Sequence, residues 1–403
     1  MESRYKSYHG LADLYVYFVE RGIGLLRSNG LLGYIVSSKF IRAGYGAPLR
    51  SVLSKTALRE IIDYADLQVF EGATTYPVII IAENCSCKNS VRYVKARPND
   101  EPDPTALAAR SHDVSMATLG PSPWTMVSSS GESVLAKIRE NAVQLRDVCG
   151  PAQLGIKTSL NAAYVIDAHV ARDLIEEDSR SKEVIKPYLR GRDVDRWHTQ
   201  TNGQFLVCMR EALNLNEYRA IAKHLRGFER ELRDRYEVKR GDYDWWVIRQ
   251  VADVTIFDGP KIVYPDLCPN PQFALNHDGS YPNNTVFCLR SDSYGVLGFL
   301  NSKLGWYWII QHCPANRGGA YRLFNQYINA IPIRTDVTTH NRLASLVDNT
   351  VTLNKKLATE QLPNRREQLQ REIDTTDRQI DQLVHQLYGL TDDEIRIVEE
   401  ATA

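Results

Sequence analysis

Three arginines, Arg190, Arg192 and Arg196, fall within seven residues of the chain, around Gly191. A guanidinium group donates paired hydrogen bonds to a phosphate or to O6 and N7 of guanine, and glycine gives a loop the freedom to present it. The segment therefore predicts a contact with nucleic acid. For any one arginine the alternatives are a solvated surface position or a local ion pair, for which Arg192 and Asp193 are candidates.

A second polar segment has the same character. Arg317 precedes Gly318-Gly319, and Tyr321-Arg322 follows, so a flexible backbone carries aromatic and cationic side chains. Asn325 and Gln326 come next, and side-chain amides of this kind pair with the edge of adenine. Both segments fit a surface that binds DNA.

An aromatic residue stands at the entrance of a strand-like run. Val69-Phe70 precedes the β-branched stretch Thr74–Ile81, whose length and composition are typical of a buried strand. Pro77 argues against a central strand, or places the first residues of the strand at an edge. On composition alone, an aromatic at this position is more often a core residue than a site residue.

The overall composition limits the classes of function. Lys+Arg and Asp+Glu both number 49, so any surface for nucleic acid must be a local patch. The seven cysteines include no CxxC pair and the nine histidines no HxxxH pattern, which predicts reduced thiols, a cytoplasmic location and no metal site. No run approaches the roughly 18 apolar residues of a membrane span. The length of 403 residues suggests two or three domains.

The first part of the chain alternates helices and strands. Apolar spacing near 3.6 predicts a helix that Gly30 ends in the left-handed conformation, and short apolar runs predict strands. Such alternation indicates an α/β, doubly wound sheet whose ligands bind at the carboxyl ends of strands, in the loops after Val36 and before Thr74. The expected elements are a helix at Leu11–Leu26, a buried strand at Leu31–Val36, a helix at Pro48–Thr56, and strands at Ile61–Tyr64 and Val78–Ile81.

These segments resemble a known enzyme family in order and spacing. Asp13-Leu14-Tyr15, Gly33–Val36, Ile61–Asp63, Val69-Phe70 and Pro77–Ile80 are similar to the second half of the catalytic domain of gamma-class N6-adenine DNA methyltransferases. The type IIG subgroup, large fused restriction–modification enzymes, is the most similar. The resemblance implies S-adenosylmethionine as the cofactor of the family.

The resemblance also assigns roles to individual residues. Phe70 would stack on the adenine that is flipped out of the duplex, because a flipped base loses its neighbours and needs an apolar face in return. Stacking of this kind is worth about 1–3 kcal/mol. Asp13 and Tyr15 would lie beside the cofactor pocket, with a helix start and a core position as their alternatives.

Two motifs that define the family are missing from these 403 residues. One is the glycine-containing strand and turn that holds the cofactor, and the other is the Asn/Asp-Pro-Pro-aromatic tetrapeptide that binds the adenine amino group. Asn270-Pro271-Gln272-Phe273 is the nearest match, but glutamine replaces the second proline, and a polar turn is expected there. We therefore expect that this chain alone does not methylate DNA.

The second part of the chain resembles the TaqI-like specificity domain, which follows the methyltransferase domain in the same family. The similar segments are 155–167, 185–194, 259–265 and 297–333. The resemblance predicts an α+β domain that recognises double-stranded DNA. The residues expected to bind DNA are Lys157, Thr158, Asn161, Lys186, Arg190, Arg192, Arg196, Arg317, Tyr321, Arg322 and Asn325.

The end of the chain is expected to be helical. Apolar residues repeat every three or four positions over Asn341–Leu387, and Pro363 divides this stretch into two helices that form a hairpin or a coiled coil. Thr391 and Glu394 then form a capping box at the start of a last helix. The predicted domains are residues 1–98 (catalytic half), 99–150 (connector), 151–334 (target recognition) and 335–403 (tail).

The sequence thus predicts the DNA-recognition part of a site-specific adenine methyltransferase of restriction–modification. Two alternatives stay open. The chain is a separately encoded half that pairs with a polypeptide carrying the missing motifs, or it is a non-enzymatic interaction protein in phage defence whose tail helices bind another protein.

Overall fold

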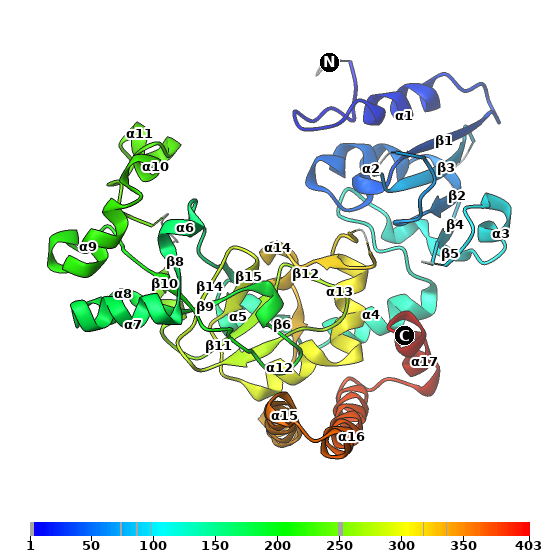
Figure 1. The fold of residues 1–403 in the computed structure, drawn as a ribbon. Helices are drawn as coiled ribbons and strands as arrows, with labels where there is room; N and C mark the ends of the chain where they lie inside the picture. The colour runs from blue at the N-terminus through cyan, green and yellow to red at the C-terminus, as the bar shows by residue number, and fades with distance from the viewer. Residues whose placement is uncertain are drawn as a thin grey trace. The chain divides into compact units, whose positions relative to one another are not determined.

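The computed structural model describes residues 4–72, 75–85, 88–97, 99–248, 253–316, 318–335 and 337–403. The chain forms two compact units, each built from segments that are far apart in sequence (Figure 1). Unit 1 consists of Met1–Glu140, Tyr307–Arg322 and Tyr388–Ala403, and unit 2 of Asn141–Trp306 and Leu323–Leu387. Both units mix helices and strands, and helices make up most of the last part of the chain.

Unit 1 is built around one five-stranded sheet in the order β1-β3-β2-β4-β5. Its elements are α1 (Tyr15–Gly24), β1 (Leu31–Ser37), η1 (Ser38–Ile41), η2 (Gly44–Gly46), α2 (Ala47–Leu53), β2 (Ala57–Asp63), β3 (Pro77–Glu83), β4 (Ser90–Lys95), α3 (Pro104–Ala108), β5 (His112–Ser115), η3 (Met116–Thr118), α4 (Ser129–Arg139), β16 (Tyr321–Arg322) and α17 (Asp392–Ala401). Helix α13 (Lys303–His312) begins in unit 2 and ends in unit 1.

The sheet of unit 1 is mixed rather than uniformly parallel. Strand β3 pairs antiparallel with β1 on one side and with β2 on the other, so that Ile79 lies between Ile35 and Ile62. Within this sheet, among the residues that the structure describes, only β2 and β4 pair in parallel. The expectation of a doubly wound sheet holds for the helix–strand alternation but not for β3, because a loop rather than a crossover helix returns the chain beside β2.

Two expectations about individual strands are wrong. Pro77 is the first residue of β3, which is paired on both sides, so proline at the start of the strand does not prevent a central position. Strand β1 was expected to be buried, yet it is the edge strand and only Leu32 within it is buried. The apolar run predicted the strand correctly. Which face of the strand is covered, however, depends on the packing of other segments.

Helices cover the two faces of this sheet unequally. Helices α1 and α2 pack on one face in a core that contains the buried Trp124, while α3 covers part of the other face through Leu107. Helix α1 begins at Tyr15, four residues later than expected. The left-handed residue after it is Asn29, with φ of 60°, and not Gly30.

The stretch expected to be a connector, residues 99–150, is divided between the units, with residues 99–140 in unit 1 and residues 141–150 in unit 2. Strand β5 extends the sheet beside β4, and α4 packs against the last helix, α17. Glu394 of α17 accepts hydrogen bonds from Lys137 at 2.6 Å and from Ser133 at 2.7 Å. The predicted capping box of Thr391 and Glu394 is confirmed.

Unit 2 contains two four-stranded sheets, in the orders β14-β9-β10-β8 and β13-β11-β15-β7. Its elements are β6 (Val143–Gln144), α5 (Leu145–Cys149), β7 (Gln153–Leu154), α6 (Asn161–Tyr164), β8 (Val165–Asp167), α7 (Ala168–Glu177), α8 (Ser181–Val184), β9 (Ile185–Leu189), η4 (Gly191–Asp193), β10 (Gln204–Val207), η5 (Leu215–Glu217), α9 (Arg219–Arg226), α10 (Glu229–Arg233), α11 (Tyr236–Arg240), η6 (Val254–Phe257), β11 (Lys261–Pro265), β12 (Leu267–Cys268), β13 (Ala274–Asn276), β14 (Tyr281–Pro282), β15 (Val286–Leu289), α12 (Tyr294–Asn301), α14 (Asn325–Ile328), β17 (Pro332–Ile333), α15 (Val337–Thr359) and α16 (Pro363–Leu387).

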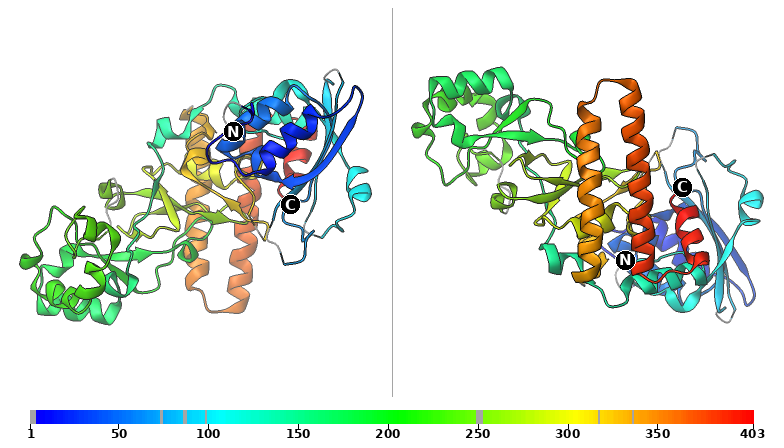
Figure 2. Two further views of the ribbon diagram at one scale, coloured as in Figure 1. Left: turned by 90° about the horizontal axis from the view of Figure 1, so that it is seen from above. Right: turned by 90° about the horizontal axis from the view of Figure 1, so that it is seen from below.

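A helical hairpin supports the sheets of unit 2. Helices α15 and α16 lie side by side, as both views in Figure 2 show, and Pro363 is the first residue of α16, which confirms the predicted division. Helix α12 packs closely on α15, because a Cβ at Gly298 would lie only 2.7 Å from the Val347 side chain. Within the described part of the chain, no helix is both long enough and apolar enough to cross a bilayer.

Candidate nucleic-acid interface

Three loops of unit 2 meet beside the parallel pair of β9 and β14. Ile156 donates its N–H to Pro282 O at 2.7 Å, and Asn283 donates its N–H to Leu189 O at 2.8 Å. A third hydrogen bond joins the Gly191 N–H to the Thr285 hydroxyl at 3.0 Å. We refer to these loops, residues 155–158, 190–193 and 282–285, as the recognition-loop cluster.

Glycine permits this close approach. A Cβ at Gly155 would lie 2.2 Å from the carbonyl oxygen of Asn283, and one at Gly191 would lie 3.0 Å from the Thr285 hydroxyl. Any larger residue at position 155 would push the loops apart, since a contact of 2.2 Å with backbone is not relieved by turning a side chain. The glycines thus fix how Lys157 and Arg192, which follow them, are carried on the surface.

The two neighbouring arginines of the cluster have different roles. Arg190 is mostly buried and holds Asp193 through two nitrogens, at 2.8 and 2.9 Å, and it also donates to Gln204. The ion pair considered from the sequence for Arg192 therefore belongs to Arg190. Arg192 is exposed, and no hydrogen bond or ion pair joins its side chain to any other residue that the structure describes. It is the cation of this loop that remains available to a ligand.

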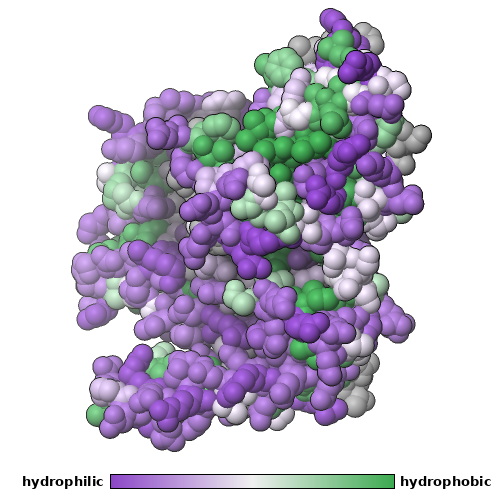
Figure 3. Space-filling model, turned by 90° about the vertical axis from the view of Figure 1, so that its right-hand side faces the viewer, coloured by the Kyte–Doolittle hydropathy of each residue, from purple (hydrophilic) through white to green (hydrophobic). Residues whose placement is uncertain are grey.

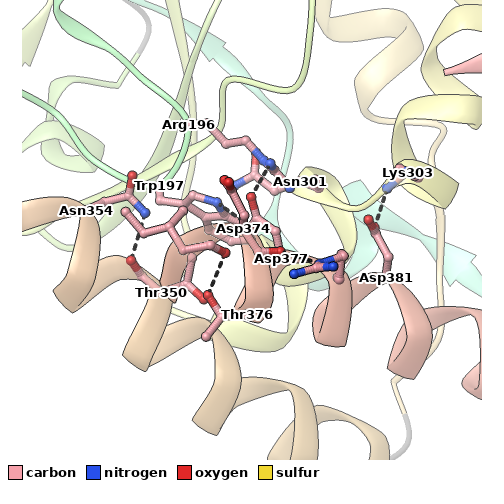
Figure 4. Close-up of polar contacts among 12 residues, drawn as sticks. Arg196, Trp197, Asn301, Lys303, Thr350, Asn354, Asp374, Thr376, Asp377 and Asp381 are labelled. Carbon is pink, nitrogen blue, oxygen red and sulfur yellow. Dashed lines mark hydrogen bonds and ion pairs between the residues drawn. The ribbon is translucent and has the colours of Figure 1, made fainter. Parts of the chain in front are cut away.

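Arg196 is directed into the protein (Figure 4). Its guanidinium pairs with Asp377 of α16 at 2.6 Å and donates to Asn301 O at 2.9 Å, and the ring nitrogen of Trp197 donates to the same carboxylate. Burial raises the pKa of Asp377, and the charge of Arg196 opposes this shift. Nearby, the N–H of Lys303 donates to Asp381 at 2.8 Å. In this structure Arg196 therefore connects the segment after η4 to helices α12 and α16.

The remaining predicted residues of unit 2 divide in a similar way. Lys157 is exposed, and its side chain makes no hydrogen bond or ion pair with the described residues, whereas Thr158 is buried and donates to Asn161. Lys186 lies 3.9 Å from Asp258 and over the ring of Tyr281. Asn325 is exposed, and its side chain accepts the N–H of the next residue. The structure thus brings Lys157 and Arg192 to the same cluster but leaves Asn325 apart from it.

The sequence reasoning missed one polar segment of this cluster. Asn283 accepts hydrogen bonds from the N–H and the hydroxyl of Thr285, which leaves the side chain of Asn284 exposed at the turn between them. An amide in this position can donate to and accept from the edge of a base. The signal was present as a proline followed by two asparagines, a pattern typical of turns.

In unit 1 the structure places the ring of Phe70 at the surface. The side chain is 43% exposed, on a loop of residues 64–76 between β2 and β3, which we call the Phe70 loop. Val69 packs instead against the small core around Ile62. The core alternative for Phe70 is therefore excluded, and the neighbouring valine fills that role.

The second predicted arginine segment belongs to unit 1 by its contacts. Tyr321 accepts a hydrogen bond from Lys95 at 3.4 Å, and its ring lies under the same ammonium group. Arg322 donates its N–H to Pro314 O. Arg317 lies outside the described residues. The compact units therefore do not follow the boundary expected at residue 334, because Tyr307–Arg322 group with the first part of the chain.

The residues expected near the cofactor make local contacts in this structure. The hydroxyl of Tyr15 is hydrogen-bonded to that of Tyr45 at 3.1 Å, and burial raises the pKa of Tyr15 well above its usual value. Asp13 is exposed, and its carboxylate accepts the adjacent N–H of Leu14. In the described ranges, no three His, Cys, Asp or Glu side chains gather to hold a metal ion.

Comparison with protein families finds two segments of the chain similar to restriction–modification proteins. Residues 1–70 match the model of the Eco57I restriction-modification methylase, and residues 186–333 match the TaqI-like C-terminal specificity domain. The resemblance drawn from the sequence is confirmed in both of its parts.

The individual relatives are Type II methyltransferases. The chain is 23% identical to M.XhoI of Xanthomonas vasicola, over 82% of this chain and 64% of the relative. It is 22% identical to M.BstVI of Geobacillus stearothermophilus, over 99% of this chain and 71% of that protein. The chain spans only 64% and 60% of M.XhoI and of M.PaeR7I from Pseudomonas aeruginosa.

The fold is also found in a solved structure. The Type IIL restriction-modification enzyme MmeI, solved in complex with DNA, aligns over 96% of this chain and 51% of its own length. The TM-score is 0.65 at 10% identity, which establishes a shared fold. The arrangement of the elements described above therefore recurs in a larger enzyme.

Proposed function

We propose that this chain is the DNA-recognition part of a site-specific N6-adenine DNA methyltransferase that uses S-adenosylmethionine and acts in restriction–modification, of the type IIG kind. Unit 2 reads the sequence of double-stranded DNA, and Phe70 of unit 1 stacks on the flipped adenine. The observation that carries the proposal is the match of residues 186–333 to a specificity domain, within which the recognition-loop cluster presents Arg192 at the surface.

The chemistry of the cluster supports sequence reading. Lys157 and Arg192 supply positive charge for phosphates or for guanine, and Asn284 supplies an amide that pairs with adenine. These side chains come from three loops that are joined by hydrogen bonds, two of which contain a closely packed glycine, so the side chains leave from a defined surface. Arg190 and Arg196 support the structure around the cluster, because Arg190 forms an ion pair with Asp193 and Arg196 forms one with Asp377.

This chain by itself binds DNA without transferring a methyl group. Its 403 residues contain no Asn-Pro-Pro-aromatic tetrapeptide, and the side chains of Asp13 and Tyr15 are engaged with neighbouring residues. Methyl transfer requires groups that hold the adenine amino hydrogens and the cofactor, and these come from a methyltransferase segment of the kind that the longer relatives contain.

Selection from a library of random-sequence duplexes tests the proposal. The chain is expected to enrich one motif that contains an adenine, and its affinity for that motif should fall steeply as salt rises, because counterions are released from the phosphates. Arg192→Ala should reduce the enrichment, while Arg226→Ala, an exposed cation of α9, serves as a control. Failure to enrich any motif at low salt would contradict the proposal.

One observation favours the second candidate, a half that is completed by another polypeptide. Leu31 and Ile35 of the edge strand β1 are 58% and 43% exposed, and Leu14, Phe18 and Leu25 of the α1 region are exposed as well. Figure 3 shows hydrophobic surface gathered over this part of the molecule. An open strand edge beside apolar side chains is a template for pairing with a further strand.

The occupant that fits this face is a methyltransferase segment with the missing motifs. Residues 1–70 match a methylase, and the match covers 64% of M.XhoI and 60% of M.PaeR7I, so each of these relatives contains further chain. Copurification with such a segment, for example the first part of a relative, should succeed with the native chain and fail with Ile35→Lys. The control Ser115→Lys changes an exposed residue of β5, at the opposite edge of the sheet. Equal capture by all three chains would refute the docking face.

A further inference from the structure

Residues 314–322 form a hairpin in unit 1, of which residue 317 is outside the described chain. Arg322 donates its N–H to Pro314 O at 2.9 Å, and Asn316 donates its N–H to Ala320 O at 2.6 Å. This 314–322 hairpin lies within the segment that matches the specificity domain. It nevertheless packs with the unit that contains the Phe70 loop.

Two backbone N–H groups at the tip of the hairpin bind a carboxylate of the Phe70 loop. Gly318 and Gly319 have φ of 79° and 74°, a conformation that favours glycine, and their N–H groups both donate to one oxygen of Asp66, at 2.9 and 3.1 Å. Successive N–H groups in a turn form a concave anion site, and hydrogen bonds to a charged acceptor are the stronger kind. These contacts join residues 252 positions apart in the sequence.

Two further contacts join the hairpin to the Phe70 loop and to strand β4. Tyr76, at the other end of the Phe70 loop, donates its hydroxyl to the side chain of Asn316 at 3.2 Å. Lys95 at the end of the neighbouring strand β4 donates to Tyr321 and lies 5.3 Å from the centre of its ring. Both ends of the loop that carries Phe70 are therefore fastened to one hairpin.

Through these contacts the hairpin can influence the position of the Phe70 ring. Asp66 is four residues before Phe70, and Tyr76 is six residues after it, so the two contacts of the hairpin flank the aromatic residue in the sequence. The ring itself is 43% exposed and is not part of the small core around Ile62. The contacts of the hairpin on either side of Phe70 are therefore placed to influence where the ring lies.

We propose that Asp66 is a positioning residue and that the 314–322 hairpin couples specific DNA binding to the placement of Phe70 for base capture. The inference rests on the proposed function, since it takes unit 2 as the reader of sequence and Phe70 as the stacking residue. DNA binding that orders the hairpin orders the Phe70 loop with it. By reciprocity, stacking of a base on Phe70 favours the ordered hairpin.

The experiment compares variants of the full chain on the duplex selected above. Asp66→Ala removes the acceptor, and Asp66→Asn keeps an oxygen that both glycine N–H groups can reach. Glu71→Ala is the matched control, because it removes an exposed carboxylate of the same loop whose side chain has no hydrogen bond or ion pair with the described residues. Phe70→Ala defines the loss of stacking.

Three measurements are made on each variant. Hydrogen exchange follows the peptides of the Phe70 loop with and without the selected duplex. Fluorescence of 2-aminopurine in place of each adenine reports an unstacked base. Fluorescence anisotropy gives the affinity for the same duplex.

The native chain and Glu71→Ala should slow loop exchange on binding and raise the fluorescence at one adenine. Asp66→Ala should keep its affinity within about twofold yet lose the loop response, with base capture about tenfold weaker, as expected for two lost hydrogen bonds. Asp66→Asn should recover part of the response.

Each other result has a defined meaning. A native-like loop response in Asp66→Ala overturns the coupling, and so does an equal loss of affinity and response, because the contact would then serve only folding or binding. If the native chain selects a motif but Phe70→Ala changes neither the loop exchange nor the 2-aminopurine fluorescence, Phe70 does not stack on the base. The proposed coupling is then refuted as well. If no motif is selected at all, the DNA-recognition function itself is refuted.

Discussion

Replacing Glu394 with glutamine should destabilise unit 1 in a way that depends on pH. The carboxylate fastens the last helix, α17, to α4. Its side chain is 8% exposed, pairs with Lys137 at 2.6 Å, accepts from Ser133, and closes the capping box with Thr391. Glutamine fills nearly the same volume and can keep part of the hydrogen bonding, so the change isolates the negative charge.

The size of the effect follows from the shifted ionisation. Burial disfavours the charged form, but hydrogen bonds from Lys137, the Thr391 N–H and Ser133 outweigh it, and they lower the pKa of Glu394 from 4.5 to about 2. This lowering of the Glu394 pKa by about 2.5 corresponds to roughly 3 kcal/mol of folding stability at neutral pH. Because the folded pKa is the lower one, this stability is complete above about pH 5 and disappears as the pH falls towards 2.

Urea unfolding of the native chain and Glu394→Gln, followed by tryptophan fluorescence, measures this difference. At pH 7 the variant should unfold with a free energy lower by up to about 3 kcal/mol, and the gap should close progressively below pH 5. Glu132→Gln on α4 removes an exposed pair with Arg139 and should cost less than about 1 kcal/mol. A gap that stays constant between pH 7 and pH 3 would refute the reasoning.

Three further predictions concern the recognition-loop cluster. Gly155→Ala should place a Cβ 2.2 Å from the Asn283 carbonyl, cost about 1–3 kcal/mol in thermal or urea unfolding, and weaken binding of the selected duplex; native-like values for both would show that the loops adapt freely. Arg192→Ala should leave the unfolding midpoint unchanged but make the slope of log affinity against log salt shallower by about one, if it contacts a phosphate. An unchanged slope together with altered motif preference would instead assign it to a base. Arg190→Ala should cost about 3–5 kcal/mol in unfolding, because it leaves the buried Asp193 without its partner, whereas a loss below 1 kcal/mol would contradict the bracing role.

The contrast between these two arginines has a practical consequence. Mutating Arg190 and Arg192 together would confuse loss of DNA contact with loss of folding, since only Arg192 has a side chain that is exposed and without an ion pair to the described residues. Single substitution of Arg192 therefore gives the clearer measure of DNA binding.

Much of the local structure could be predicted from neighbouring residues. Pro363 at the start of α16, the capping box of Thr391 and Glu394, and the strand at Leu31–Ser37 all depend on signals that act within a few positions of the chain. The same holds for the order of the segments that resemble a specificity domain, because that order is written in the sequence itself. The proposed function also rests on these segments.

The tertiary structure decided which of the candidate side chains are available and which segments meet. Arg190, Arg192 and Arg196 are alike in sequence, yet two are held by Asp193 and by Asp377, the latter 181 residues away from Arg196. The hydrogen bonds between the 314–322 hairpin and Asp66 could not be predicted from the sequence of either segment alone. The partner of a charged side chain and the exposure of a ring depend on how distant parts of the chain pack, and local spacing carries no record of that.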